Sequence, residues 1–149
     1  MYLGIDFGKK RIGLALGVLM PHVAGVIDGE LSSEIILGKI LKICQENEVE
    51  KIIIGLPIRS QGEEGTLAGT IREFAADVAE FCQLPVYFEP EQYTSSEAER
   101  ILVETDNRGD KSRIDEMAAV LLLEQFISRL ESEGANSVRP DFEVRDTKL

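Results

Sequence analysis

The sequence predicts an α/β protein in which helices cover both faces of a mixed five-stranded sheet. Three short apolar runs near 2–7, 11–17 and 23–27 are separated by breaks that contain glycine, a pattern typical of an antiparallel meander. The β-branched run over 51–57 is typical of a parallel strand that is buried on both faces. A short strand pattern at 86–88 follows it after a helical stretch, so we expect parallel strands to extend the three antiparallel ones.

The segments between and after these strands have helical patterns. Ser32 or Ser33 can cap the first helix, whose isoleucine and leucine side chains recur at close to helical spacing. We expect one domain over residues 1–133, followed by a loosely ordered tail over 134–149. The expected helices lie over 33–47, 67–82, 94–105 and 112–131.

Length and composition favour a cytoplasmic protein with a sizeable core, because 149 residues is the usual size of one domain. No run approaches the roughly 18 consecutive apolar residues of a membrane span. The N-terminus also lacks the basic and apolar regions of a signal peptide, so we expect no membrane partner. Cys44 and Cys82 lie within helical patterns and lack a CxxC partner, so we expect packed, reduced thiols.

The net charge of −11 argues against a protein that wraps nucleic acid electrostatically. The acidity is concentrated over 61–107, which carries eleven acidic and two basic residues. Basic residues gather at two turn-like places, where they could flank a phosphate backbone or simply form a solvated surface. These places hold Lys9, Lys10 and Arg11, and Arg108, Lys111 and Arg113.

Asp6 stands out because a charged side chain interrupts an otherwise apolar strand pattern. The strand turns at Gly8 and the pattern resumes at Ile12, so Asp6 would project from the sheet beside the turn. A carboxylate fixed in this way can hold a divalent cation. The residue chemistry is equally consistent with a carboxylate that hydrogen-bonds the turn amides, as aspartates near turns often do.

Glu91 and Asp115 stand at the ends of other elements, where open sheets place ligands. Glu91 lies between the strand at 86–88 and a helix start, in a segment that also suits a plain solvated loop. Asp115 opens the last helix and could equally belong to a capping box begun by Ser112. Helical spacing places Asp115 on the stripe that faces the sheet, so it could converge with Asp6.

Four segments of the chain carry motifs that are weak alone and specific together. They are 4–15, 54–57 with Gly62, 91–98 and 115–119. In order and spacing they resemble the YqgF/RuvX family over roughly residues 2–130. The resemblance implies an RNase H-like fold and a nuclease, which is described for the family both as a Holliday junction resolvase and as the enzyme that matures the 5′ end of bacterial pre-16S ribosomal RNA.

The resemblance further implies that Asp6, Glu91 and Asp115 form a metal triad that holds one or two Mg²⁺ or Mn²⁺ ions for phosphodiester hydrolysis. Such ions would offset the negative charge that otherwise repels the substrate. The expected substrate is structured RNA, including pre-rRNA on ribosomal particles, with branched DNA as the alternative. The candidates for contacts with this substrate are Lys9, Lys10, Arg11, Arg113, Gly55 and Gly62.

The chain departs from the family pattern in two places. Where the family typically has Asp-Glu-Arg, segment 90–92 is Pro-Glu-Gln, which keeps the carboxylate and makes Glu89 a candidate substitute ligand. The loop after the strand at 51–57 has Arg59 and Gln61 where the family commonly has asparagine and aspartate. Either difference would weaken or alter the positioning of the substrate.

Two other functions fit parts of the sequence. The opening also resembles the phosphate loop of actin-like ATPases and sugar kinases, but those enzymes close two such domains around a nucleotide and 149 residues supply one. A non-catalytic ribosome-assembly or nucleic-acid-binding module would suit the altered 90–92 segment and the acidic surface. The sequence leaves open the choice between RNA and DNA, the cleavage site, the metal number and a monomeric or homodimeric state.

Overall fold

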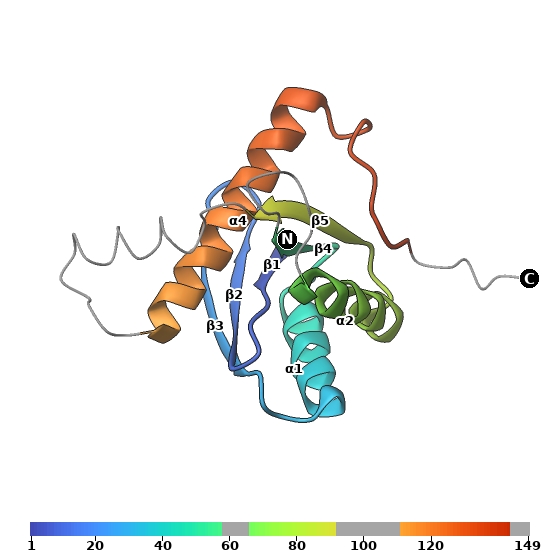
Figure 1. Cartoon of the computed structure of the whole chain (residues 1–149). Coiled ribbons are helices and arrows are strands. Elements are labelled where there is room, and N and C mark those ends of the chain that lie inside the picture. The colour runs from blue at the N-terminus through green and yellow to red at the C-terminus, as the bar shows by residue number, and fades with distance from the viewer. Residues whose placement is uncertain (58–65, 92–110, 144–149) are drawn as a thin grey trace, which may run out of the picture.

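The computed structural model describes residues 1–57, 66–91 and 111–143 of the chain. Within these residues the helices are α1 (Ser33–Glu46), α2 (Thr66–Cys82) and α4 (Lys111–Glu133). α1 and α2 pack side by side on one face of a central sheet, and α4 covers the other face (Figure 1). The expected helix over 94–105 lies outside the described residues.

The central sheet is mixed, as the sequence predicts. Its strands are β1 (Tyr2–Asp6), β2 (Arg11–Gly17), β3 (His22–Asp28), β4 (Lys51–Pro57) and β5 (Val86–Glu91). They lie in the order β3-β2-β1-β4-β5. β1, β2 and β3 form the antiparallel meander, and β4 and β5 extend it with parallel pairing.

An apolar core fills each of the two layers. One core lies between the sheet and the α1–α2 pair and includes Leu3 and Ile5 of β1, and the other lies beneath α4 and includes Phe126. Because successive side chains of a strand point to opposite faces, Gly4 and Asp6 face α4. The free thiols of Cys44 and Cys82 are buried in the α1–α2 core, as expected.

The segment after α4 is better ordered than the sequence suggests. Val138 is buried, and Phe142 exchanges two backbone hydrogen bonds with Val86 at the outer edge of β5. The Asp141 carboxylate also accepts a 2.8 Å hydrogen bond from the backbone N–H of Phe88. The expectation of a loosely ordered tail is therefore wrong for 134–143, because this segment covers a strand edge that would otherwise expose unpaired backbone groups.

β5 is also longer than the strand expected over 86–88, since it runs on through Pro90 to Glu91. Proline and neighbouring glutamates suggest a loop, but an edge strand tolerates proline because its missing N–H leaves no partner unsatisfied on the open side. The extension places Glu91 at the end of β5, beside Pro57 of β4.

α4 lies unusually close to the sheet where it crosses β2 and β1. A β-carbon added to Gly13 would overlap the backbone carbonyl of Asp115, and one added to Gly4 would lie 3.1 Å from the carbonyl oxygen of Ala119. Ala118 and Ala119 are fully buried, which agrees with the expectation that α4 approaches the sheet through small side chains. Gly13 therefore fixes the height of the start of α4 above β2.

We expect Gly13→Ala to lower the melting temperature and to displace the start of α4. Overpacking typically costs about 1–3 kcal/mol, and here the obstacle is backbone that cannot rotate away. The measurement is thermal unfolding followed by circular dichroism. Gly69→Ala on α2 is the matched control, since an added β-carbon meets nothing within 4 Å there. A Gly13→Ala protein as stable as the wild type would show that α4 can move without cost.

Candidate active site

The three predicted acids come from three different elements and lie toward one end of the sheet. Asp6 ends β1 and is 9% exposed, and Glu91 ends β5. Asp115 lies near the N-terminus of α4, directly above Gly13. Asp6 and Gly13 are partners in the β1–β2 ladder, so the start of α4 stands beside the Asp6 side chain. The fold thus gathers residues that are far apart in the sequence.

The Asp6 and Glu91 carboxyl groups are hydrogen-bonded to each other. Burial raises the pKa of Asp6 to about 9, and the charge of Glu91, its hydrogen bond and the charge of Asp115 act in the same direction. Burial also raises the pKa of Glu91, although the hydrogen bond from Asp6 opposes this shift. At neutral pH the pair therefore holds a proton that the two carboxyl groups share.

Gly55 makes the contact between these carboxyl groups sterically possible. Ile5 pairs with Ile54, so Asp6 and Gly55 are the next residues along two neighbouring strands. A β-carbon on Gly55 would lie 2.6 Å from Oε2 of Glu91. The space above Gly55 is thus filled by the Glu91 carboxylate, whereas the sequence suggested close approach of a nucleic-acid strand there. Gly62, the other glycine in that prediction, lies outside the described residues.

Asp115 is held by Arg11 at the start of β2. The Arg11 Nε donates a 2.8 Å hydrogen bond to Oδ2 of Asp115, and the two side chains are 34% and 24% exposed. Arg11, expected to contact substrate phosphates, is therefore engaged with an acid of the site in this conformation.

The donor chemistry of the three acids fits a hard divalent cation, but the present arrangement is incomplete. Carboxylate oxygens are the ligands that Mg²⁺ and Mn²⁺ prefer. Asp6 and Glu91 share a proton in a buried site. Such a cation would take the place of this proton and stabilise both groups as carboxylates. Within the three described ranges, however, no three acidic, histidine or cysteine side chains are grouped closely enough to bind one ion. Opening the Arg11–Asp115 ion pair would free the third carboxylate.

The remaining predicted contacts surround this site. Lys9 and Lys10 are exposed in the β1–β2 turn, which is fixed by a 2.9 Å hydrogen bond from the Gly29 N–H to the Lys10 carbonyl. Arg113 is exposed near the start of α4. Their contact with a substrate stays a prediction, and Arg59, Gln61 and Arg108 lie outside the described residues.

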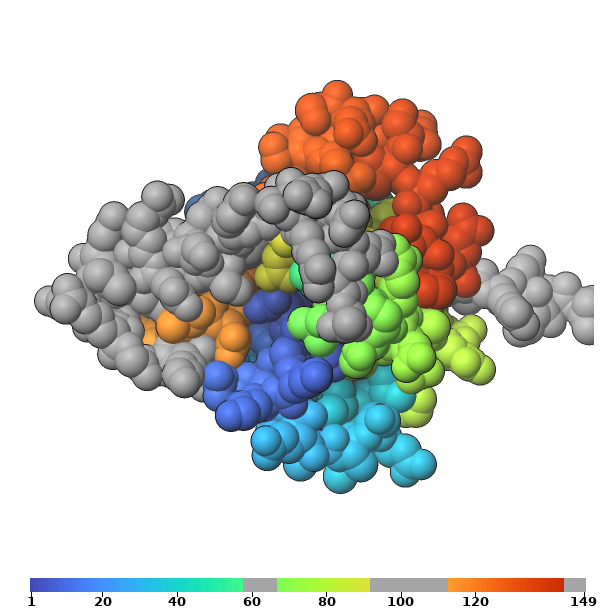
Figure 2. All heavy atoms as spheres, in the orientation of Figure 1, coloured from blue at the N-terminus to red at the C-terminus, as the bar shows by residue number. Residues whose placement is uncertain are grey.

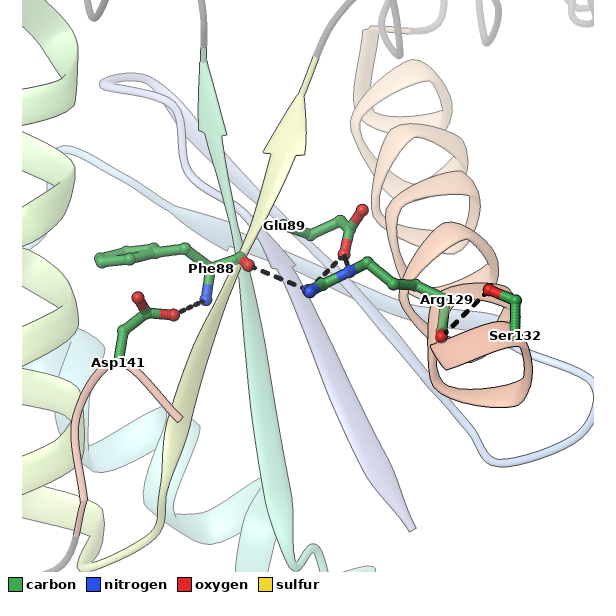
Figure 3. Close-up of polar contacts among 5 residues, drawn as sticks. All are labelled: Phe88, Glu89, Arg129, Ser132 and Asp141. Atoms are coloured by element: carbon green, nitrogen blue, oxygen red, sulfur yellow. Dashed lines mark hydrogen bonds and ion pairs between the residues drawn. The ribbon is translucent and has the colours of Figure 1, made fainter. Parts of the chain in front are cut away.

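Glu89, the candidate substitute ligand, is paired with Arg129 of α4. Nε and Nη2 of Arg129 lie 3.0 and 2.9 Å from Oε1 of Glu89, and Nη2 also donates to the Phe88 carbonyl at 3.4 Å (Figure 3). Burial raises the pKa of Glu89, and the Arg129 charge partly offsets that shift. The sequence did not reveal this pair, since its members lie 40 residues apart and share no local pattern.

The order of the strands is that of an RNase H-like fold. T. thermophilus RuvC in complex with a Holliday junction substrate superimposes with a TM-score of 0.57 at 16% identity, covering 93% of this chain and 98% of RuvC. A second T. thermophilus RuvC structure gives 0.52 at 15% identity, with the same coverage. At these identities the likeness establishes the fold alone.

The chain belongs to the RuvX family, described as Holliday junction resolvase, whose model matches residues 1–129. Relatives named "Putative pre-16S rRNA nuclease" support this membership. The protein of Sulfurihydrogenibium sp. is 34% identical, covering 86% of this chain and 90% of the relative. The protein of Pelotomaculum thermopropionicum is 36% identical, covering 93% and 97%. The resemblance noted in the sequence is therefore confirmed. Of the described helices, none is long and apolar enough to cross a membrane.

We expect Asp6→Asn to stabilise the metal-free protein at alkaline pH. The folded wild type keeps the Asp6 proton to about pH 9, whereas the unfolded chain releases it near 3.8. Because the folded state binds more protons in that window, the free energy of unfolding falls as pH rises from 3.8 to about 9. The variant lacks this contribution.

Thermal melts in EDTA across this pH range measure the effect. The difference between the two melting curves should grow toward higher pH in favour of Asp6→Asn. The raised pKa of Glu91 also makes the free energy of unfolding of the wild type fall as pH rises, by a smaller amount. The effect of Asp6 is therefore read from the difference between the two proteins. Equal slopes for both proteins would contradict a proton held at Asp6.

We expect Gly55→Ala to impair the site more than the fold. The added methyl group would displace the end of a flexible side chain, Glu91, and would press lightly on Leu122 at 3.3 Å. The contact between Asp6 and Glu91 would then be lost while the backbone stays in place. The readout is the slope of stability against pH, which should become shallower with only a small change in melting temperature at acidic pH. An unchanged slope would show that the Glu91 carboxyl group still contacts Asp6 in the variant.

Proposed function

We propose that this chain is a divalent-metal-dependent nuclease that hydrolyses phosphodiester bonds in structured RNA, and that its substrate is the 5′ end of pre-16S rRNA. The observation that carries the proposal is the buried Asp6–Glu91 carboxyl pair beside Asp115. Burying two acids in contact is unfavourable for folding, and such arrangements occur mainly at functional sites, so the pair favours a catalytic role. The names of the relatives support RNA as the substrate.

Asp6, Glu91 and Asp115 would hold one or two Mg²⁺ or Mn²⁺ ions. A bound ion of this kind lowers the pKa of its water and stabilises charge on phosphoryl oxygens. The protein itself supplies a rigid β1 position for Asp6 and a glycine-made recess for Glu91. Lys9 and Lys10, exposed in the turn that follows Asp6, would contact the phosphate backbone and orient the strand without selecting bases.

Arg11 would exchange partners when substrate binds. In the present structure its guanidinium neutralises Asp115. A substrate phosphate offers two oxygen acceptors that a guanidinium can bind together and would compete for Arg11, which releases Asp115 toward the other two acids. Binding of substrate and completion of the metal site would thus depend on each other.

The family description favours a second substrate, the DNA Holliday junction. A resolvase must cut two symmetry-related strands, so this function requires two copies of the chain, whereas trimming an RNA end requires one. Sedimentation of the protein with and without a four-way junction tests that requirement. We place either activity in the cytoplasm.

The proposal is tested by cleavage of a pre-16S rRNA 5′ fragment and of a four-way DNA junction, each in Mg²⁺, Mn²⁺ and EDTA. We expect metal-dependent cleavage of the RNA by the wild type. Asp6→Asn, Glu91→Gln and Asp115→Asn should each lose at least about 100-fold in rate, since even groups that only support metal ligands contribute 10- to 100-fold.

Glu89→Gln is the matched control for these variants. Glu89 lies on the same strand as Glu91 and is also buried, but its partner is Arg129. We expect this variant to cleave at close to the wild-type rate. Metal-independent cleavage, or full activity in Asp6→Asn, would contradict the proposal. Binding of RNA without cleavage would favour the non-catalytic module.

A further inference from the structure

A groove runs between α1 and α2 on the face of the sheet opposite the acids. Its upper part has a volume of about 220 Å³ and is lined by Leu31, Ile36, Leu37 and Phe74 among other residues. A second hollow of about 380 Å³ continues along the same helices to Phe81. Both are bordered by Leu37, which makes them one surface feature, the α1–α2 groove. Figure 2 shows the two helices exposed side by side at the surface.

Several apolar side chains line the α1–α2 groove beside polar ones. The Phe7 and Phe74 rings lie 4.7 Å apart between their centroids and close the inner end. At the outer end the Phe81 side chain is 45% exposed, which is high for a large aromatic residue. Leu37 lies between these two ends. The groove therefore offers apolar contacts along one continuous line.

The rim of the α1–α2 groove is acidic. Glu73, Asp77 and Glu80 are exposed and recur at helical spacing on one side of α2. Among the described residues that line the groove, none is lysine, arginine or histidine. On α1, the Nζ atom of Lys42 lies 3.9 Å from Oε1 of Glu46, so this lysine is paired within its own helix. This surface repels a phosphate backbone and attracts a cationic partner.

We propose that the α1–α2 groove binds a basic amphipathic segment of a partner protein, whose apolar side chains contact Leu37 and Phe81 while its lysine or arginine side chains pair with the acids of α2. An amphipathic helix that lays its apolar face in a groove is a recurring mode of recognition. The acidic rim excludes nucleic acid as the occupant. A second copy of this chain is disfavoured because each copy carries a net charge of −11.

This surface is independent of the candidate active site. Phe7 packs with the α1–α2 core, whereas Asp6, the preceding residue, faces α4. A partner in the groove would thus leave the acids open to substrate. Binding of a partner in the α1–α2 groove does not depend on nuclease activity.

The test uses the full chain and a fluorescein-labelled helical peptide of about 14 residues built from leucine and lysine, followed by anisotropy. We expect saturable binding that weakens about tenfold in Asp77→Lys and in Phe81→Ser, since one interface charge or aromatic anchor contributes on that scale. Both residues are exposed on α2, so both variants should fold. A peptide with serine in place of leucine should bind about tenfold more weakly.

Glu131→Lys is the charge-matched control, because Glu131 is exposed on α4 at the other face of the sheet. It should bind the peptide like the wild type, and Asp77→Lys should retain the wild-type cleavage rate. Equal weakening in Glu131→Lys and Asp77→Lys would show a response to net charge alone and would overturn the proposal.

Discussion

The contact between the buried carboxyl groups of Asp6 and Glu91 is the constraint on which the candidate site depends. Two acids in a low-dielectric environment cannot both be charged at little cost, so one proton is retained and shared. The apolar cores on the two faces of the sheet must compensate for this unfavourable burial. The arrangement lowers the stability of the fold and provides carboxylate oxygens for a cation, as expected where a site is selected for chemistry.

Two glycines on the strands beside β1 leave the space that lets the other acids lie close to Asp6. Gly13 admits the backbone of α4 on one side, and Gly55 admits the Glu91 carboxylate on the other. Any side chain at either position would push one acid away from Asp6. The glycines therefore act by the space they leave, and neither has a left-handed backbone that would itself require glycine. Arg11 then holds the third acid, Asp115, at the edge of the cluster.

Local patterns predicted most of the fold. The meander, the β4 run and the helices α1 and α2 were identifiable because periodicity, glycine breaks and a serine cap act within a few residues. The end of β5 and the packing of 134–143 were not, because Pro90 and Phe142 are ordered by an edge strand that only the folded sheet creates. The three candidate acids were predicted from their positions and the family resemblance, and their role stays a prediction. The pairing of Glu89 with Arg129 and the recess at Gly55 depend on contacts between distant segments, which no local pattern reports.

The two faces of the sheet resolve an apparent conflict between a strongly acidic chain and a nucleic-acid substrate. At the candidate site, Asp6 and Glu91 are buried and share a proton, and Asp115 and Glu89 are paired with arginine, so these four acids present little charge to solvent. Lys9 and Lys10 are exposed beside them. On the α1–α2 side, the acids of α2 are exposed and set against apolar side chains. The exposed acids of α2 thus repel a misplaced phosphate backbone on that face, which leaves the β1–β2 turn as the more favourable approach.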